Sequence, residues 1–104
     1  MSGKRIGSFS GSGSVELNGE VLSAADYHLE IYQDFIQGQM MEGSYNIPGG
    51  KRIEGTVRGK GLPMGEKLTL VTREGYKLEF FMESSYGTIA ATGPLLNLEG
   101  KAVV

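Results

Sequence analysis

The chain has 104 residues, ten Lys and Arg against twelve Asp and Glu, and no cysteine, so its formal net charge is −2. A chain of this length forms one domain whose core needs no metal or disulfide for stability. The missing thiols exclude disulfides and thiolate zinc sites, and the slight acidity argues against nucleic acid as a partner, because affinity for nucleic acid depends on neutralising many phosphates.

The sequence shows neither the apolar run of a signal peptide nor the roughly 20 apolar residues of a membrane helix. We therefore expect a cytoplasmic protein without membrane contact. Seventeen glycines punctuate the chain at the spacing of turns. The expected organisation is a single β domain over residues 1–104, with segments 1–6 and 100–104 fraying at its ends.

Residues 7–17 alternate strictly between two faces. Phe9 and Val15 share one face with glycines, and serines occupy the other. Asn18-Gly19 follows, a pair typical of a type I′ hairpin turn. A Gly-Ser tract also suits a flexible linker, but the shared apolar face and the turn favour a strand. Its glycines would let another layer approach closely or let the strand bend.

Residues 23–37 fit two structures. A serine cap and a glycine stop suit a helix, whereas Tyr27, Leu29 and Ile31 alternate with polar residues as in a strand. A long first strand joined by a two-residue turn needs a long partner, which favours the strand. Unbroken pairing from the turn would send these three apolar residues to the serine face, so we predict a β-bulge within residues 23–25.

The segment 38–51 is rich in glycine and predicts a long loop, with a short extended piece over residues 44–47 at most. Residues 52–58 alternate again and predict a strand that directs Ile53 and Val57 inward.

Residues 67–82 predict a β-hairpin. Two alternating runs flank the three-residue link 73–75, which ends in the glycine that a type I turn with a G1 bulge places at positive φ. This turn sets the register, with Leu70 opposite Leu78. Residues 88–92 predict a further strand, ended by Gly93 and Pro94, and residues 95–98 a short last one.

These elements predict an all-β fold: an antiparallel meander of six or seven strands that forms a small β-barrel. A two-sheet β-sandwich is the alternative, and an α+β fold would follow if residues 23–37 were helical.

Four polar residues recur on one predicted strand: Asp26, His28, Glu30 and Asp34. On a strand the first three stand about 6.6 Å apart in a row. A 2-His-1-carboxylate iron site needs two histidines, and the chain has only His28. The row therefore favours a solvated strand face, with no metal, no cofactor and no enzymatic role expected.

Four cations form a weak basic candidate: Lys51, Arg52, Arg58 and Lys60. The glycine-rich segment before them lacks the spacing of a phosphate-binding loop. An ordinary loop is favoured, and nucleic-acid binding would require these cations to cluster beside exposed aromatic residues.

Two sets of apolar residues remain. Val71, Phe81 and Tyr32 point away from the predicted core, which indicates a protein interface or cover from the loop 38–50. A ligand cavity could be lined by Tyr27, Tyr45, Tyr76 and Tyr86, although side chains usually fill small barrels.

The sequence thus predicts a non-enzymatic β-barrel module for binding or assembly, acting through a face that contacts a partner protein or further copies of itself. Two alternatives stay open. One is a carrier of a small apolar or aromatic ligand in the barrel interior. The other is a hydrolase or lyase that uses Asp26, His28 and Glu30.

Overall fold

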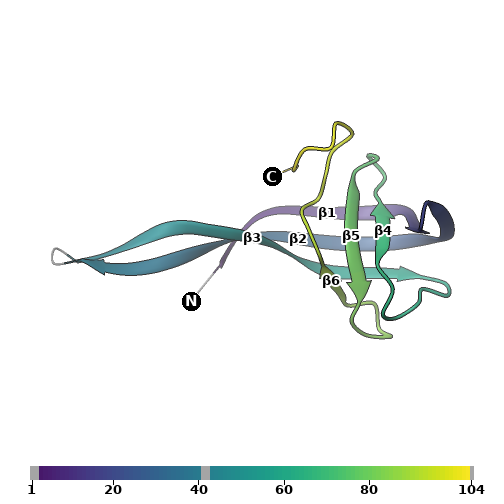
Figure 1. Cartoon of the computed structure of the whole chain (residues 1–104), viewed down its shortest axis with the longest axis horizontal. Coiled ribbons are helices and arrows are strands. Elements are labelled where there is room, and N and C mark those ends of the chain that lie inside the picture. Colours follow the sequence, from purple (N-terminus) through teal and green to yellow (C-terminus); the bar gives the residue numbers. More distant parts are fainter. Residues whose placement is uncertain (1–2, 41–42, 104) are drawn as a thin grey trace.

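The structure, a computed structural model, describes residues 3–40 and 43–103. These residues form six antiparallel strands in one sheet, joined by turns and loops, and no helix occurs among them (Figure 1). The all-β prediction is confirmed, and neither the sandwich nor the α+β alternative is found. The strands are β1 (Gly3–Leu17), β2 (Glu20–Met40), β3 (Gly43–Gly59), β4 (Leu68–Val71), β5 (Lys77–Met82) and β6 (Ile89–Ala91).

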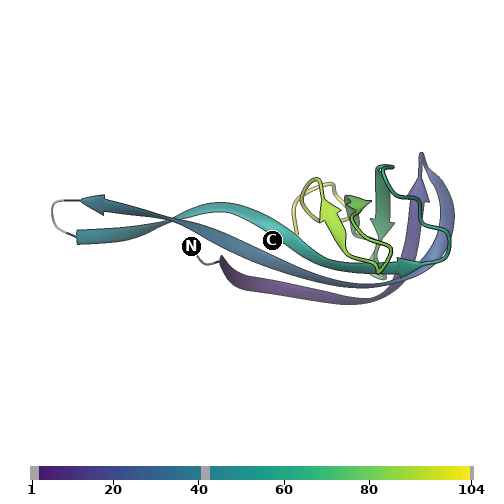
Figure 2. The ribbon, with the colours of Figure 1, turned by 90° about the horizontal axis from the view of Figure 1, so that it is seen from below.

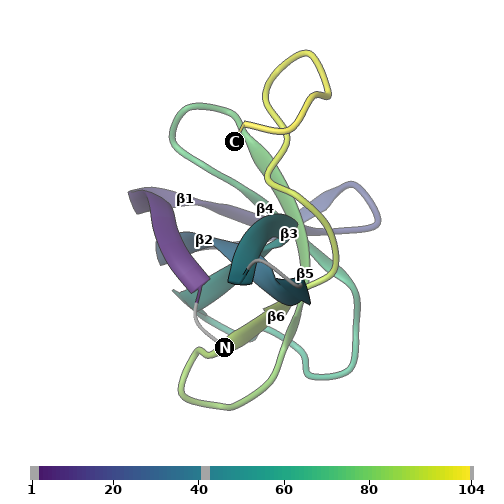
Figure 3. The same cartoon turned by 90° about the vertical axis from the view of Figure 1, so that its left-hand side faces the viewer.

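The sheet curls into a nearly closed barrel. Its strand order is β3-β2-β1-β4-β5-β6, so two three-stranded meanders are joined where β4 pairs with β1. The outermost strands meet through a bridge between Thr56 of β3 and Thr88 of β6. Figure 3, which looks along the long axis, shows β1, β5 and β6 on different sides of the molecule, with β2 and β3 pointing toward the viewer in the middle. Closure removes most of the free sheet edge at this end of the molecule.

The turn between β1 and β2 has the predicted geometry. Asn18 and Gly19 have φ angles of 53° and 84°, as both central residues of a type I′ turn require. Val15 pairs with Ser23 and Glu16 with Val21, so Leu22 is the bulged residue, one position before the predicted stretch. The bulge has the predicted effect, because it turns the apolar residues of β2 toward the core.

The β4–β5 hairpin is confirmed in register. Leu70 pairs with Leu78 and Leu68 with Phe80. Gly75 has a φ of 89°, the positive value predicted for the end of the turn. The segment predicted as a last short strand contributes isolated bridges from Leu96 to β5 and to Ala102 rather than a strand.

The core lies between the inward faces of the strands and holds Phe80, the largest fully buried side chain. Fully buried aliphatic residues from β1 to β5 and from the segment after β6 surround it, as period-two alternation requires. They are Val15, Leu29, Ile31, Val57, Leu68, Leu70, Leu78 and Leu95.

The prediction of a long loop over residues 38–51 is wrong. β2 continues to Met40 and β3 begins at Gly43, and the two strands pair along the whole stretch from Phe35–Pro48 to Met40–Gly43. Glycine weakens a strand without excluding one, so its abundance here did not mark a loop.

We call residues 35–40 and 43–50 the arm. β1 reaches only as far as the pair Gly3–Asp34, so the arm is a two-stranded ribbon that projects from the barrel (Figures 1 and 2). The molecule measures 55 × 30 × 21 Å, and its radius of gyration is 15.8 Å, against about 13 Å for a compact domain of this length.

Both terminal segments are hydrogen-bonded where they are described. Lys4 and Arg5 pair with β2, and the Val103 N–H donates to the Leu95 carbonyl oxygen at 2.8 Å. Their predicted fraying stays a prediction.

Candidate functional site

The predicted polar row lies on the outer face of β2. Asp26 and His28 are exposed, while their neighbours Tyr27 and Leu29 are buried. This separation follows from the bulge at Leu22, which fixes the face that each residue of β2 presents. The row therefore stands on the outside of the barrel wall.

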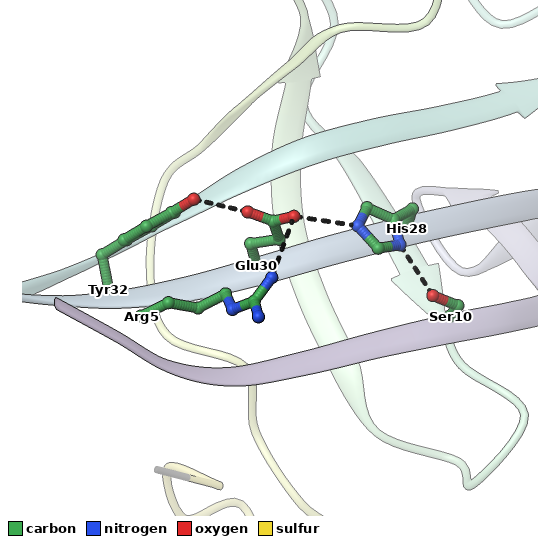
Figure 4. Close-up of polar contacts among 5 residues, drawn as sticks. All are labelled: Arg5, Ser10, His28, Glu30 and Tyr32. Carbon is green, nitrogen blue, oxygen red and sulfur yellow. Dashed lines mark hydrogen bonds and ion pairs between the residues drawn. The ribbon is translucent and has the colours of Figure 1, made fainter.

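Two members of the row, His28 and Glu30, contact each other, and side chains from β1 and β2 extend this pair into a chain of polar contacts (Figure 4). His28 Nδ1 lies 2.7 Å from Ser10 Oγ, and His28 Nε2 lies 3.1 Å from Glu30 Oε1. Tyr32 donates its hydroxyl hydrogen to the other oxygen of Glu30. Arg5 Nη1 lies 3.7 Å from Glu30 Oε1. Next along, Ser12 donates to Asp26 at 2.6 Å.

These contacts hold Glu30 in its ionised form. The hydrogen bond from Tyr32 lowers the pKa of Glu30 most, followed by the hydrogen bond with His28. The same bond raises the pKa of the Tyr32 hydroxyl, because ionising the tyrosine would lose the bond and place two negative charges together. A carboxyl group with a lowered pKa is a poor general acid and a weak base at neutral pH.

A serine, a histidine and a carboxylate in contact are also the components of a hydrolase triad. Here the His28 side chain is 50% exposed. Neither His28 nor Glu30 lines any of the three grooves that the structure describes. Water reaches a half-exposed imidazole freely, so this arrangement gives the hydrolase hypothesis no support.

Replacing Tyr32 by phenylalanine is expected to raise the pKa of Glu30 toward its ordinary value, because its strongest hydrogen bond is lost. In the native protein the lowered pKa stabilises the fold above the unfolded-state pKa, and this contribution disappears as the pH falls through the folded-state value. The contribution should shrink in the variant. Carbon-13 NMR titration of the side-chain carboxyl group measures the pKa.

The control is Tyr76→Phe, which removes a hydroxyl from the other side of the barrel wall, where Tyr76 packs edge-on against Phe9. It should leave the Glu30 titration unchanged. An unaltered pKa in Tyr32→Phe would contradict the assignment of the hydrogen bond.

The four predicted basic residues do not form one patch. Arg52 Nε lies 3.0 Å from Asp34 Oδ1, and its guanidinium also pairs with Glu54 and stacks 4.6 Å above the Tyr32 ring. Arg58 lies about 20 Å farther along β3, at the strand's rise of about 3.3 Å per residue. Lys60 follows β3 near Arg58, and Lys51 lies beside a groove described below.

The four tyrosines do not share a cavity where their side chains are described. Tyr27 is buried, and its hydroxyl accepts from the Arg73 N–H at 3.1 Å and donates to Glu74 at 3.3 Å. Tyr76 is half-buried, whereas Tyr86 is 84% exposed. The Tyr45 side chain lies outside the part of the chain whose side chains are described.

The predicted interface residues are half-buried. Val71 lies in β4 between Ser14 and Lys77, and Phe81 lies in β5 beside Ala90. The segment expected to cover them is the arm, which instead projects away from β4 and β5 (Figure 1). Tyr32 is engaged by Glu30 and Arg52. Of the two predicted explanations for Val71 and Phe81, the interface remains a prediction.

A groove that the sequence did not reveal opens beside β3. It has a volume of about 520 Å³ and lies between the inward face of β2 and β3 and the segment that follows β6. Its wall is mainly apolar and includes Ile31, Ile53, Ala91, Pro94 and Leu95, with Lys51 also lining it.

Comparison with protein-family models, curated proteins and solved structures finds no match for this chain. Within residues 3–40 and 43–103, no group of three or more histidine or carboxylate side chains is arranged to hold a metal ion. In the same ranges there is no helix of the length and apolarity needed to cross a membrane.

Proposed function

We propose that this protein is a non-enzymatic assembly module that associates with further copies of itself through the arm. The observation that carries the proposal is the two-stranded ribbon beyond Asp34, which pairs with no third strand in the described residues. An isolated two-stranded ribbon is marginally stable in water, and a third strand or a packed layer stabilises it.

The composition of the arm supports a covered state. Large apolar residues occupy five of its positions: Phe35, Ile36, Met40, Tyr45 and Ile47. Since a two-stranded ribbon has no layer of its own in which to bury such residues, a second molecule is the natural source of cover.

Two free strand edges give the same support. β1 pairs with β4 only over residues 14–16, so in the described chain residues 3–13 have a strand on one side only. β3 likewise pairs with β2 on one side and, on the other, makes only the bridge at Thr56. Free edges of this length present backbone N–H and C=O groups for pairing with another chain.

The β1 and β3 edges lie on opposite sides of the three-stranded ribbon. Pairing of β1 in one copy with β3 in the next would be head-to-tail and would repeat into a ring or filament, whereas pairing of β3 with β3 would close as a dimer. The mass of the assembly therefore distinguishes the two arrangements.

Light scattering after size-exclusion chromatography tests the proposal. The intact chain should show a mass that rises with concentration above the 11.2 kDa of the monomer. A shortened variant without the arm is the comparison. In it Asn-Gly replaces residues 34–50, because Gln33 and Lys51 face each other and a two-residue turn can join them. It should associate much more weakly than the intact chain, because it keeps the β1 edge but lacks the arm.

Circular dichroism and cooperative denaturation of the shortened variant provide the control, since the barrel strands and their core are retained. An intact chain that stays monomeric throughout, or a folded shortened variant that associates as tightly as the intact chain, would overturn the proposed role of the arm.

A further inference from the structure

The seam between β3 and β6 is closed at one end and open at the other. Thr56 and Thr88 form a bridge, and the adjacent Val57 N–H donates to the Gly87 carbonyl oxygen at 2.8 Å. In the antiparallel register that this bridge sets, Ile53 would face Ala91, but no backbone hydrogen bond between them is found in the described chain. The groove of about 520 Å³ opens at this point.

The wall of the groove continues the barrel core. Ile31 and Leu95 are each 1% exposed, and Ile53 packs against the core from β3. The volume lies within the range of about 300–1,000 Å³ that small-molecule sites occupy, and such sites are mostly apolar with a few polar groups that orient the ligand.

Lys51 supplies such a polar group. Along β3 the inward face carries Val57, Gly55 and Ile53, and period two places Lys51 next on that face, at the groove. Lys51 has no ion pair in the described residues. The neighbouring Arg52 is already engaged by Asp34 and Glu54, so the Lys51 ammonium is the cation available to a ligand.

We propose that the groove binds an amphiphilic anion of the fatty-carboxylate class, with its alkyl chain along Ile53, Ala91 and Pro94, which keep exposed surface in the groove, and its carboxylate on Lys51. An apolar wall selects the chain, and a single cation at its edge selects the negative head group. This site is separate from the arm and does not rest on the proposed self-association.

Titration with octanoate below its micelle concentration tests the proposal, followed by amide chemical shifts. Octanoate should shift the amide resonances of Ile53 and of residues 91–93 and 95 at saturable concentrations. The variant Lys51→Gln should bind octanoate about three- to fivefold more weakly, as expected for loss of a partly exposed ion pair. Its affinity for 1-octanol, which carries no charge, should be unchanged.

Lys60→Gln is the matched control, because it makes the same charge change at an exposed lysine outside the groove. It should leave octanoate binding unaltered. Equal weakening in the two lysine variants, octanoate shifts outside the groove, or no saturable binding would each overturn the proposal.

A second pair of variants tests the apolar wall. Ala102 is exposed and lines the groove, so Ala102→Trp should obstruct it and weaken octanoate binding at least tenfold while the protein stays folded. Ala24→Trp makes the same change at an exposed alanine elsewhere and should have no effect. Full octanoate affinity in a folded Ala102→Trp protein would contradict binding in this groove.

Discussion

Replacing Gly13 by alanine is expected to lower the free energy of unfolding by about 3 kcal/mol, a large share of the stability of a small domain. A Cβ atom at this position would lie 2.0 Å from the carbonyl oxygen of Val71 and 3.1 Å from the carbonyl carbon. Both are backbone atoms, so no side-chain rotation relieves the contact. β4 would have to move away from β1, and β4 carries Leu68 and Leu70 of the core.

Chemical denaturation measures this effect, and Gly7→Ala on the same strand is the control. A Cβ atom at Gly7 would meet its nearest neighbours, in Phe9 and Ile31, at 3.7–4.0 Å, an ordinary contact. Alanine in a strand interior is at least as favourable as glycine, so Gly7→Ala should leave the midpoint nearly unchanged. Equal midpoints for the two variants would mean that β1 and β4 do not approach as closely as the structure shows.

The sequence predicts this fold well wherever short-range turn chemistry sets the pairing. Asn18-Gly19 and Gly75 each fix a hairpin, and the alternating residues on both sides then identify the core. The bulge was predictable because Phe9 and Leu29 could share a face only if one residue was added between them and the turn. Its position at Leu22 was missed by one residue, since the alternation constrains the number of inserted residues more tightly than their place.

The arm was missed for the opposite reason. Residues 38–51 contain glycine at several positions and have no strict alternation, so local rules read them as a loop. What keeps them extended is pairing between β2 and β3, which continues outward from the barrel past a one-residue register shift between Gln33 and Phe35. Once two long strands are paired, adding further residue pairs at their ends costs little conformational entropy, provided that the local sequence does not oppose an extended backbone.

The polar row and the groove show the same contrast between features that local sequence determines and features that strand pairing determines. The outward position of His28 and Glu30 followed from alternation together with the predicted bulge, whereas the contacts of Ser10 and Arg5 with them depend on the register between β1 and β2. The groove depends on how far β3 and β6 separate beyond Thr56 and Thr88. No local pattern in either strand encodes that distance, because it is a property of barrel closure.

Replacing Phe80 by alanine is expected to lower the free energy of unfolding by about 3–5 kcal/mol. Phe80 is the largest of the fully buried side chains and lies between Leu68 and Ala91 in the sheet. Its removal costs the transfer free energy of the ring and leaves a cavity that the paired strands can only partly fill. Urea denaturation should show a lower midpoint with an unchanged slope, as a pure loss of stability requires.

Phe81→Ala is the matched comparison, since the two residues are adjacent on β5 and face opposite sides of the sheet. Phe81 is half-buried, so its truncation should cost about 1–2 kcal/mol. If Phe81 contributes to the predicted interface, Phe81→Ala should also weaken self-association in light scattering, whereas Phe80→Ala should do so only in proportion to the unfolded fraction. A Phe81 variant as unstable as the Phe80 variant would show that β5 does not separate an inner from an outer face. The core and the interface would then have to be reassigned together.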